Sequence, residues 1–386
     1  MKEMIKAAIF TPGKRGWGLP MLFWGPGGVG KSDIIEEVGR EWKMHVEVLS
    51  PSERGEGAFG VTPMPRKMVS GAYVVTYPAP DWIESFEDFD GRGIVFLDEL
   101  TTAPPILQAP MLGLIQAGRI GGATLGSLVR ILAAANPPEI AANGWEPAPP
   151  LANRLGHMNW EAPTEDEWAQ FTLSNSGIDD RNSVRNDPAA EEARVLAAWP
   201  SAYAKAAGLI TSFHSRNRGK LHNHPKAGDP NSGRAWCSHR SWSNAIRAAA
   251  SAEIHGLSES DSIEMISAFV GSGAVKELIQ YKLTMDLPDP ADVLDGKVKW
   301  EHDPDRLDRS MAIINSLVSL AVTSEVNRAT RVPRLWSIID KTPADDVVAL
   351  TIKPLSKARL TTHPAATPVL ARIRPIQKAA GISQKL

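Results

Sequence analysis

Short runs rich in apolar residues recur in the first 160 residues and end at glycines or polar residues. They lie at 19–24, 44–49, 93–97 and 128–135. Runs of this length predict strands, and the uninterrupted run at 93–97 is typical of a central parallel strand that is buried on both faces. Between the first two runs, the apolar positions of 33–42 fall on one helical face. This alternation predicts an α/β fold with a parallel sheet.

After residue 163 the apolar positions follow a helical period instead. Thr164 and Glu167 fit a capping box at the start of the first helix, and Pro200 separates two later helices. The expected helices lie at 164–171, 191–199, 202–213, 242–255, 261–269 and 306–326. The predicted organisation is an α/β core at 1–163 with an insert near 50–80, an α-helical lid at 164–345 with a polar loop near 214–236, and a C-terminal tail at 346–386.

Length and composition narrow the class of protein. A chain of 386 residues is too long for one ordinary core, and its 43% apolar and 22% charged residues are typical of a soluble globular protein. Its single cysteine, Cys237, excludes an internal disulfide framework and suits a reducing compartment. No run of 18 apolar residues occurs and the N-terminus does not resemble a signal peptide. We therefore expect a cytoplasmic protein with no membrane segment.

The charge is uneven along the chain, although the net charge of −2 gives no overall attraction to nucleic acid. The segment 214–240 carries six Lys or Arg and one acid, and the segment 347–386 carries seven Lys or Arg and no acid. Each segment fits a docking site for a polyanion or an acidic partner, and each also fits a solvated loop or chain end.

One glycine-rich motif follows the first strand directly. It fits G-x-x-x-x-G-K-[ST], with an expected strand before it and an expected helix after it. Glycines let backbone N–H groups surround a phosphate, and the positive end of the helix points toward it. In this pattern the lysine contacts the β- and γ-phosphates and the hydroxyl binds Mg²⁺. The predicted nucleotide-binding residues are Gly25, Pro26, Gly27, Gly28, Val29, Gly30, Lys31 and Ser32.

Two carboxylates end the strand at 93–97, and a third strand ends at an amide. Asp98 is the expected partner of the Mg²⁺ shell together with Ser32, and Glu99 is the expected residue that polarises the attacking water. We expect the two acids to point to opposite sides, because adjacent residues on a strand do so. Asn136 follows the strand at 128–135 and is expected beside the γ-phosphate. Together these residues predict an ATPase that uses ATP and Mg²⁺.

The three motifs, in this order, resemble those of the AAA+ ATPases, and within them the MoxR-like group. The resemblance covers roughly 240 residues, and the segments that carry it best are Pro80-Asp81-Trp82-Ile83, Phe96-Leu97-Asp98-Glu99-Leu100, Ala103-Pro104-Pro105 with Gln108-Ala109, Leu151-Ala152-Asn153-Arg154-Leu155 and Cys237-Ser238-His239-Arg240-Ser241-Trp242. The last segment departs from the group's pattern, because His239 stands where the group has proline. The resemblance implies a P-loop NTPase core followed by an α-helical lid.

Further roles are implied by the resemblance alone. Arg154 matches the arginine finger that reaches the γ-phosphate of a neighbouring subunit, and Arg240 matches the sensor-2 arginine, with Arg234 as the alternative. An arginine that acts in trans implies a homo-oligomer, and the group's usual form is a hexamer. MoxR-like ATPases often act on a partner with a von Willebrand factor A-type domain.

Two inserts are candidates for contact with such a client. The segment 50–78 corresponds to the group's insert in helix 2, which faces the ring pore, and 71–77 is expected to be a strand of a small hairpin. Tyr73 and Tyr77 fall on the same side of it, where they either grip a client or pack the hairpin itself. The second insert, 118–126, is a short hairpin with Gly121 at its turn.

Three functions are consistent with these residues. The first is an ATP-driven ring that remodels or activates a partner protein. The second is a DNA-directed AAA+ ATPase that holds phosphates with the basic loop and tail, although the chain has no helix-turn-helix and no aromatic stacking motif. The third is a nucleotide switch without efficient turnover, which would not need Glu99.

Overall fold

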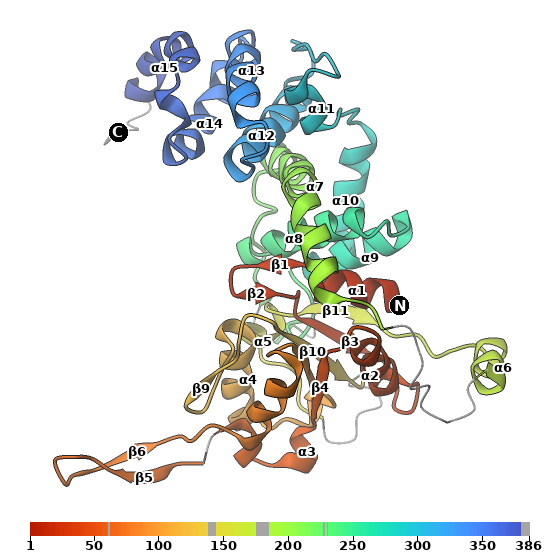
Figure 1. Ribbon diagram of the computed structural model, residues 1–386. Coiled ribbons are helices and arrows are strands. Elements are labelled where there is room, and N and C mark those ends of the chain that lie inside the picture. Colours follow the sequence, from red (N-terminus) through yellow and green to blue (C-terminus); the bar gives the residue numbers. More distant parts are fainter. Residues whose placement is uncertain (61, 138–143, 175–184, 227, 230, 380–386) are drawn as a thin grey trace.

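The computed structural model describes residues 1–60, 62–137, 144–174, 185–226, 228–229 and 231–379. An α/β part with the N-terminus occupies one end of the molecule, and a stack of helices with the C-terminus occupies the other (Figure 1). In the described part of the chain, no helix combines the length and apolar character needed to cross a membrane.

Five strands form one parallel sheet within the described residues. They are β3 (Met21–Trp24), β4 (His45–Leu49), β7 (Gly93–Leu97), β10 (Val129–Ala135) and β11 (Gly156–Asn159), in the spatial order β11-β3-β10-β7-β4. All neighbouring pairs are parallel, with Leu132 opposite Met21 and Phe96. The predicted α/β fold with a parallel sheet is confirmed. All five residues of β7 are buried, as the apolar run predicts.

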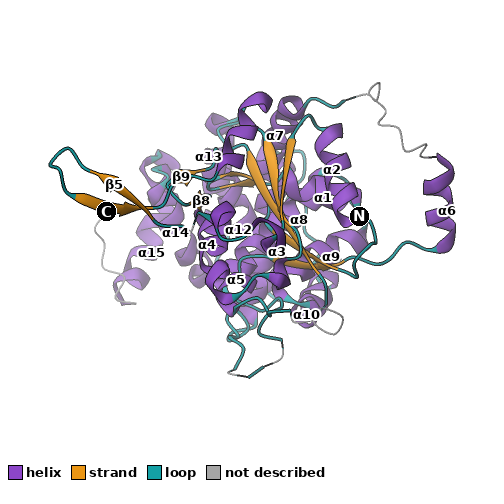
Figure 2. Cartoon of the chain, turned by 90° about the horizontal axis from the view of Figure 1, so that it is seen from below, coloured by secondary structure: helices purple, strands orange, loops and turns teal. Residues whose placement is uncertain are grey.

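Successive side chains of a strand point to opposite sides, so the apolar strands place apolar side chains on both faces of the sheet. Both faces are covered by other elements. Phe23 and Phe96 enter a core shared with α1 (Lys2–Ile9), α2 (Lys31–Glu41) and the helical part, whereas Leu22 and Leu97 enter a second core against α4 (Pro105–Ala117) and α5 (Pro149–Ala152). Figure 2 shows the sheet between these helices. The carboxyl ends of the strands are thereby left as the accessible edge for ligands.

The C-terminal half is helical, as predicted. Its helices are α6 (Glu165–Ser174), α7 (Pro188–Arg216), α8 (His239–Ile254), α9 (Glu259–Val270), α10 (Ser272–Leu283), α11 (Pro290–Asp295), α12 (Leu307–Thr323), α13 (Arg328–Asp340), α14 (Asp345–Lys357) and α15 (Thr367–Ala379), with 3₁₀ turns η4 (Leu360–Thr362) and η5 (Pro364–Ala366). The capping box at α6 forms, since the Glu167 N–H donates to Thr164 Oγ1 at 3.2 Å and the Thr164 N–H donates to Glu167 Oε2 at 2.8 Å.

Two expectations for this half change. Residues 191–199 and 202–213 belong to the single helix α7, with Pro200 inside it, so the predicted break at Pro200 is wrong. Proline removes one backbone hydrogen bond from a helix, but α7 packs along α8 and α12, and this burial holds it together. The expected basic tail is helical in α14 and α15, which pack with Trp336 in a core that they share with α11, α12 and α13.

Short elements complete the α/β part. They are β1 (Pro12–Gly13), β2 (Gly16–Trp17), α3 (Pro51–Arg54), η1 (Gly57–Phe59), β5 (Met64–Lys67), β6 (Tyr73–Thr76), η2 (Asp81–Phe89), η3 (Leu100–Thr102), β8 (Arg119–Ile120) and β9 (Ala123–Thr124). The hairpins expected within 50–78 and 118–126 are β5–β6 and β8–β9.

Candidate nucleotide site

The predicted phosphate loop connects β3 to α2 at the carboxyl end of the sheet. Gly28 and Gly30 have φ of 78° and 80°, a backbone region that favours glycine. The loop is tied to the sheet where the Gly25 N–H donates to the Ala135 carbonyl at 3.1 Å. Residue 30 is the N-cap of α2, so the amide-rich positive end of this helix opens onto the loop. This is the arrangement that binds phosphate in other proteins.

Lys31 is folded back into the loop. Its Nζ donates to the carbonyl oxygens of Gly25 at 2.8 Å and Pro26 at 2.7 Å, and the residue is 8% exposed. Burial lowers the pKa of Lys31, while the nearby charges of Asp98 and Glu99 oppose this shift. The ammonium group is therefore hydrogen-bonded within the loop, in the field of the two carboxylates that follow β7.

The hydroxyl of the loop meets the first of these carboxylates. Ser32 Oγ donates to Asp98 Oδ2 at 2.6 Å, although the residues are 66 positions apart. Asp98 Oδ1 accepts the N–H of Glu99 at 2.9 Å, which fixes the orientation of the carboxylate. A hydroxyl and a carboxylate are hard oxygen donors of the kind that bind Mg²⁺ beside nucleotide phosphates. Ser32 and Asp98 therefore fit a magnesium site.

Glu99 differs from the expectation in its backbone. It is not the next residue of a strand, because β7 ends at Leu97 and Glu99 has φ of 51° as the N-cap of η3. The expected reason for the separation of the two acids is therefore wrong: a left-handed turn separates them, not strand alternation. A non-glycine residue in this region costs about 1–3 kcal/mol and is often found at functional sites. The side chain of Glu99 is exposed.

The sheet order places Asn136 near these groups. Asn136 directly follows β10, which lies between β3 and β7. The end of β10 is thus flanked by the phosphate loop on one side and Asp98 on the other. Asn136 is half-buried there. The structure brings together the loop, Asp98, Glu99 and the position of Asn136 at one edge.

Arg154 lies at the other edge of the sheet. It precedes β11, whose first residue, Gly156, pairs with Met21 at the start of β3. The guanidinium donates to the Pro150 carbonyl at 2.5 Å and to Gln116 Oε1 at 2.8 Å. Burial lowers the pKa of Arg154, and the charge of Arg240 lowers it further. The structure does not bring Arg154 into the phosphate loop of its own chain.

The two candidates for the lid arginine are in different places. Arg240 lies in the first turn of α8 and its charge acts on Arg154. Arg234 stacks over the ring of Trp24, with Cζ 3.7 Å from the ring centroid, and Trp24 is the residue before the phosphate loop. Arg234 is thus the one in contact with the strand that leads into the loop.

Sequence reasoning missed the contacts that support this corner. Trp24 Nε1 donates to His157 Nδ1 at 3.0 Å, and the other ring nitrogen, Nε2, lies 2.9 Å from the Ala152 carbonyl. Burial lowers the pKa of His157 to about 4, so the ring is neutral at pH 7. Asn153 links this corner to the helical part, because its Oδ1 accepts from Ser238 Oγ at 2.8 Å. The only sequence signal for this contact is that Asn153 and Ser238 lie within two residues of Arg154 and Arg240, respectively.

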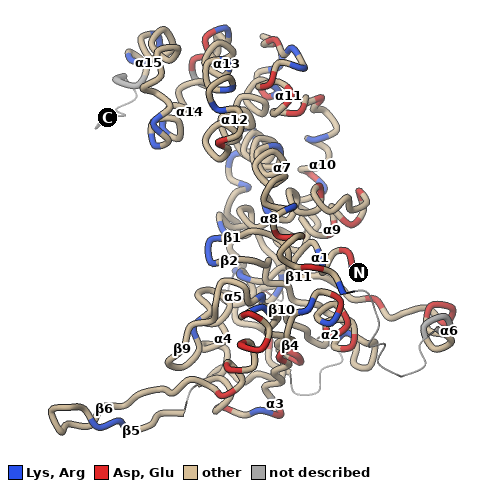
Figure 3. Tube along the Cα trace, in the orientation of Figure 1, with Lys and Arg blue, Asp and Glu red and all other residues tan. Residues whose placement is uncertain are grey.

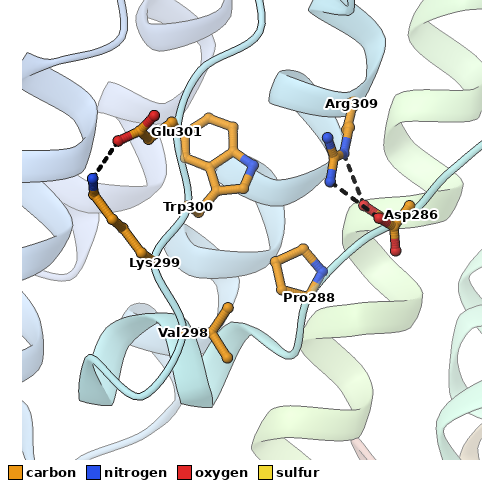
Figure 4. Close-up of a pocket in the computed structure, with 7 residues that line it drawn as sticks. All are labelled: Asp286, Pro288, Val298, Lys299, Trp300, Glu301 and Arg309. Atoms are coloured by element: carbon orange, nitrogen blue, oxygen red, sulfur yellow. Dashed lines mark hydrogen bonds and ion pairs between the residues drawn. The ribbon is translucent and has the colours of Figure 1, made fainter.

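A hollow of about 510 Å³ lies elsewhere, in the helical part. Figure 4 shows Trp300 at its wall and two ion pairs, Arg309 with Asp286 at 3.4 Å and Lys299 with Glu301 at 2.5 Å. Because each of these cations faces an acid, the hollow does not present a positive surface to phosphate.

Comparisons with known proteins do not identify a family. No family model and no curated protein match the chain. Among solved structures, a candidate ATPase from Cytophaga hutchinsonii aligns with 72% of this chain and 87% of its own, at 11% identity and a TM-score of 0.46. Identity at this level does not indicate a shared activity.

Proposed function

We propose that this protein binds ATP with Mg²⁺ and hydrolyses it to ADP and phosphate. The observation that carries the proposal is the 2.6 Å hydrogen bond from Ser32 Oγ to Asp98 Oδ2. It joins the end of the phosphate loop to the acidic end of β7, two segments that are each ambiguous alone. The Lys31 ammonium group, which is held in the loop and feels the charges of Asp98 and Glu99, supports the same conclusion.

Each residue then has a distinct task. The loop amides and the start of α2 bind the phosphates, and Lys31 exchanges its two carbonyl acceptors for phosphate oxygens. Ser32 and Asp98 would hold Mg²⁺, which neutralises charge that develops on the phosphates. Glu99, exposed at the edge of the sheet, accepts a proton from the attacking water. Asn136 orients this water from the end of β10.

We further propose a homo-oligomeric ring, with a hexamer as the expected form. The position of Arg154 supports it, because this arginine lies at the edge of the sheet away from its own loop. In other NTPases an arginine supplied to the phosphates contributes about 10³–10⁵ in rate. By resemblance to the MoxR-like group, the ring remodels or activates a partner protein, and a von Willebrand factor A-type domain is the partner class to test first.

The DNA-directed alternative has less support. Two cations of the expected basic loop face acids, since Arg216 Nη1 lies 2.6 Å from Asp308 and Lys220 is paired with Glu277. A salt-sensitive shift of DNA by the protein would nevertheless favour this alternative.

Two substitutions test the site. Lys31→Ala should abolish ATP binding measured by calorimetry, and retained tight binding would contradict the phosphate-loop assignment. Glu99→Gln should bind ATP and lose turnover, because the amide cannot accept the proton. Near-normal turnover in this variant would place the base elsewhere, and ATP binding with no turnover in the wild type would favour the nucleotide switch.

Mixing experiments test the ring. Arg154→Ala should lose turnover and regain part of it when mixed with Lys31→Ala subunits, which supply Arg154 to intact loops. The absence of any rescue would show that Arg154 acts within its own chain or only packs against Gln116.

A further inference from the structure

The hairpin β5–β6 projects from the α/β part with no other element beside its tip (Figure 1). Its base is fixed, because the turn between β8 and β9 lies against it: a Cβ on Gly121 would stand 2.2 Å from the Pro78 carbonyl. The hairpin is therefore a projecting, two-stranded sheet whose C-terminal side contacts the β8–β9 turn at its base.

Large apolar side chains of the hairpin face solvent. Their exposed fractions are 53% for Met64, 46% for Met68, 110% for Val69, 69% for Tyr73, 67% for Val75 and 51% for Tyr77. Of the two alternatives for the tyrosines, packing within the hairpin does not fit these values. The register places Tyr73 and Val75 on one face of the hairpin, and Met64 and Met68 on the other. Exposed apolar residues grouped on one element mark interaction sites.

The register of the hairpin shows which backbone groups are free. The Met68 N–H donates to the Ala72 carbonyl at 2.8 Å, so this pair is hydrogen-bonded. Hydrogen-bonded and non-hydrogen-bonded pairs alternate along an antiparallel ladder. The pairs Lys67–Tyr73 and Pro65–Val75 are therefore non-hydrogen-bonded. Their N–H and C=O groups point outward, away from the partner strand.

The two outer edges are not equivalent. Edge strands are usually protected by proline or by charged residues, and β5 has both, with Pro65 lacking an outward N–H and with Arg66 and Lys67. β6 has neither, since its sequence is Tyr-Val-Val-Thr. No backbone partner of Tyr73 or Val75 occurs on this outer edge among the described residues. The edge of β6 is thus open to a further strand.

The charge of the hairpin indicates which side chains the added strand carries. No acid occurs between residues 57 and 80, whereas Arg66 and Lys67 lie in β5, as Figure 3 shows for the hairpin. A strand added to β6 would lie two strand spacings, about 10 Å, from β5. This is slightly more than the Debye length of about 8 Å at physiological salt, so the attraction between these charges is partly screened there and strengthens as the salt concentration falls.

We propose that the outer edge of β6 binds an extended, acidic polypeptide segment as a third antiparallel or parallel strand. The outward groups of Tyr73 and Val75 form main-chain hydrogen bonds with it. Arg66 and Lys67 point to opposite faces of the hairpin, so the cation on the face that carries the acidic side chains attracts them. The inference rests on the proposed function and specifies the chemistry of the partner. Binding of the acidic segment to β6 does not require nucleotide.

The test uses a fluorescent peptide of alternating Val and Glu, followed by anisotropy with the full chain and no nucleotide. Matched peptides carry Lys in place of Glu, or Pro in place of every second Val. We expect the Val-Glu peptide to bind at least tenfold more tightly than either. Val75→Pro removes one outward N–H and should weaken binding at least tenfold, whereas Pro65→Ala, directly opposite on the other edge, should leave it within twofold.

Residue-resolved amide exchange separates this mode from others. With the peptide bound, the amides of Tyr73 and Val75 should become protected, while that of Lys67 should not. Val74 faces β5, and its continued protection in Val75→Pro would show that the hairpin remains folded. Three results would overturn the proposal. They are equal binding of all the peptides, unchanged peptide binding by Val75→Pro, and protection of the Tyr73 and Val75 amides only when the protein binds anionic vesicles or DNA or associates with itself. Peptide binding without ATPase activity would instead contradict the proposed function alone.

Discussion

Replacing Glu192 by leucine should destabilise the whole molecule, because it leaves a buried arginine without its charge partner. Arg130 lies in β10, is fully buried, and its Nη2 lies 2.5 Å from Glu192 Oε1 on α7. Its Nε donates to the Ile9 carbonyl at 3.2 Å and its Nη1 donates to the Leu128 carbonyl. The guanidinium thus joins the sheet, α1 and the helical part at one point.

The size of the effect follows from burial. Removing one partner of a buried ion pair typically costs 3–5 kcal/mol, since the remaining charge is neither solvated nor neutralised. Burial already lowers the pKa of Arg130 despite Glu192, and the nearby charge of Arg92 lowers it further. We therefore expect about 4 kcal/mol of lost stability, which for a chain of 386 residues is a fall in melting temperature of roughly 5 °C.

The assay is thermal unfolding followed by tryptophan fluorescence at fixed protein concentration and without nucleotide. The control is the double variant Arg130→Met with Glu192→Leu, which removes both charges and should recover most of the loss. A Glu192→Leu variant that melts within 1–2 °C of the wild type, or a double variant as unstable as the single one, would refute the reasoning.

Three further predictions concern the site. Asp98→Asn should weaken Mg²⁺ binding about 10–100-fold. The nucleotide-free fold should stay intact, because the amide oxygen still accepts the Glu99 N–H. A magnesium titration of ATP binding measures the loss of Mg²⁺ affinity. Arg234→Gln should lower the melting temperature slightly and weaken ATP binding, through loss of its contact with Trp24; equal ATP affinity would assign it a packing role only. Burial lowers the pKa of His157 to about 4, below its ordinary value of about 6.5. The contribution of neutral His157 to folding stability is therefore full above pH 6.5 and falls by about 3 kcal/mol as the pH approaches 4, because the unfolded chain binds the proton first. Melting curves of the wild type and His157→Gln between pH 7 and 4.5 should converge toward the acid end.

The sheet and the phosphate loop were predictable from sequence because their causes are local. A strand buried on both faces needs an unbroken apolar run, which β7 has, and Phe96 and Leu97 then fill the two cores. The phosphate loop was predictable because Gly28 and Gly30 adopt left-handed backbone conformations, which favour glycine. The same local reasoning failed at Pro200, where the packing of α7 against α8 and α12 outweighs one lost hydrogen bond.

Contacts between distant segments were not predictable in this way. Nothing local shows that Arg130 meets Glu192, or that Arg234 lies over Trp24, because each pair depends on how the helical part sits against the sheet. The turn at Glu99 was missed for another reason: a run that ends in two acids does not show where the strand stops.

The position of Arg154 is consistent with the proposed ring. Four residues of β11 separate the start of that strand from its carboxyl end, a distance of about 10–13 Å along the sheet. The guanidinium points to the Pro150 carbonyl and to Gln116 Oε1, which are neutral acceptors. Its positive charge is therefore balanced by neither of its hydrogen-bond partners, and it lies on the wrong edge for its own nucleotide. In the proposed ring this half-buried arginine would exchange two neutral acceptors for the charged phosphates of an adjacent subunit. If the proposed ring forms, we expect hydrolysis to depend on assembly, because a neighbouring subunit would then supply this side chain to each loop.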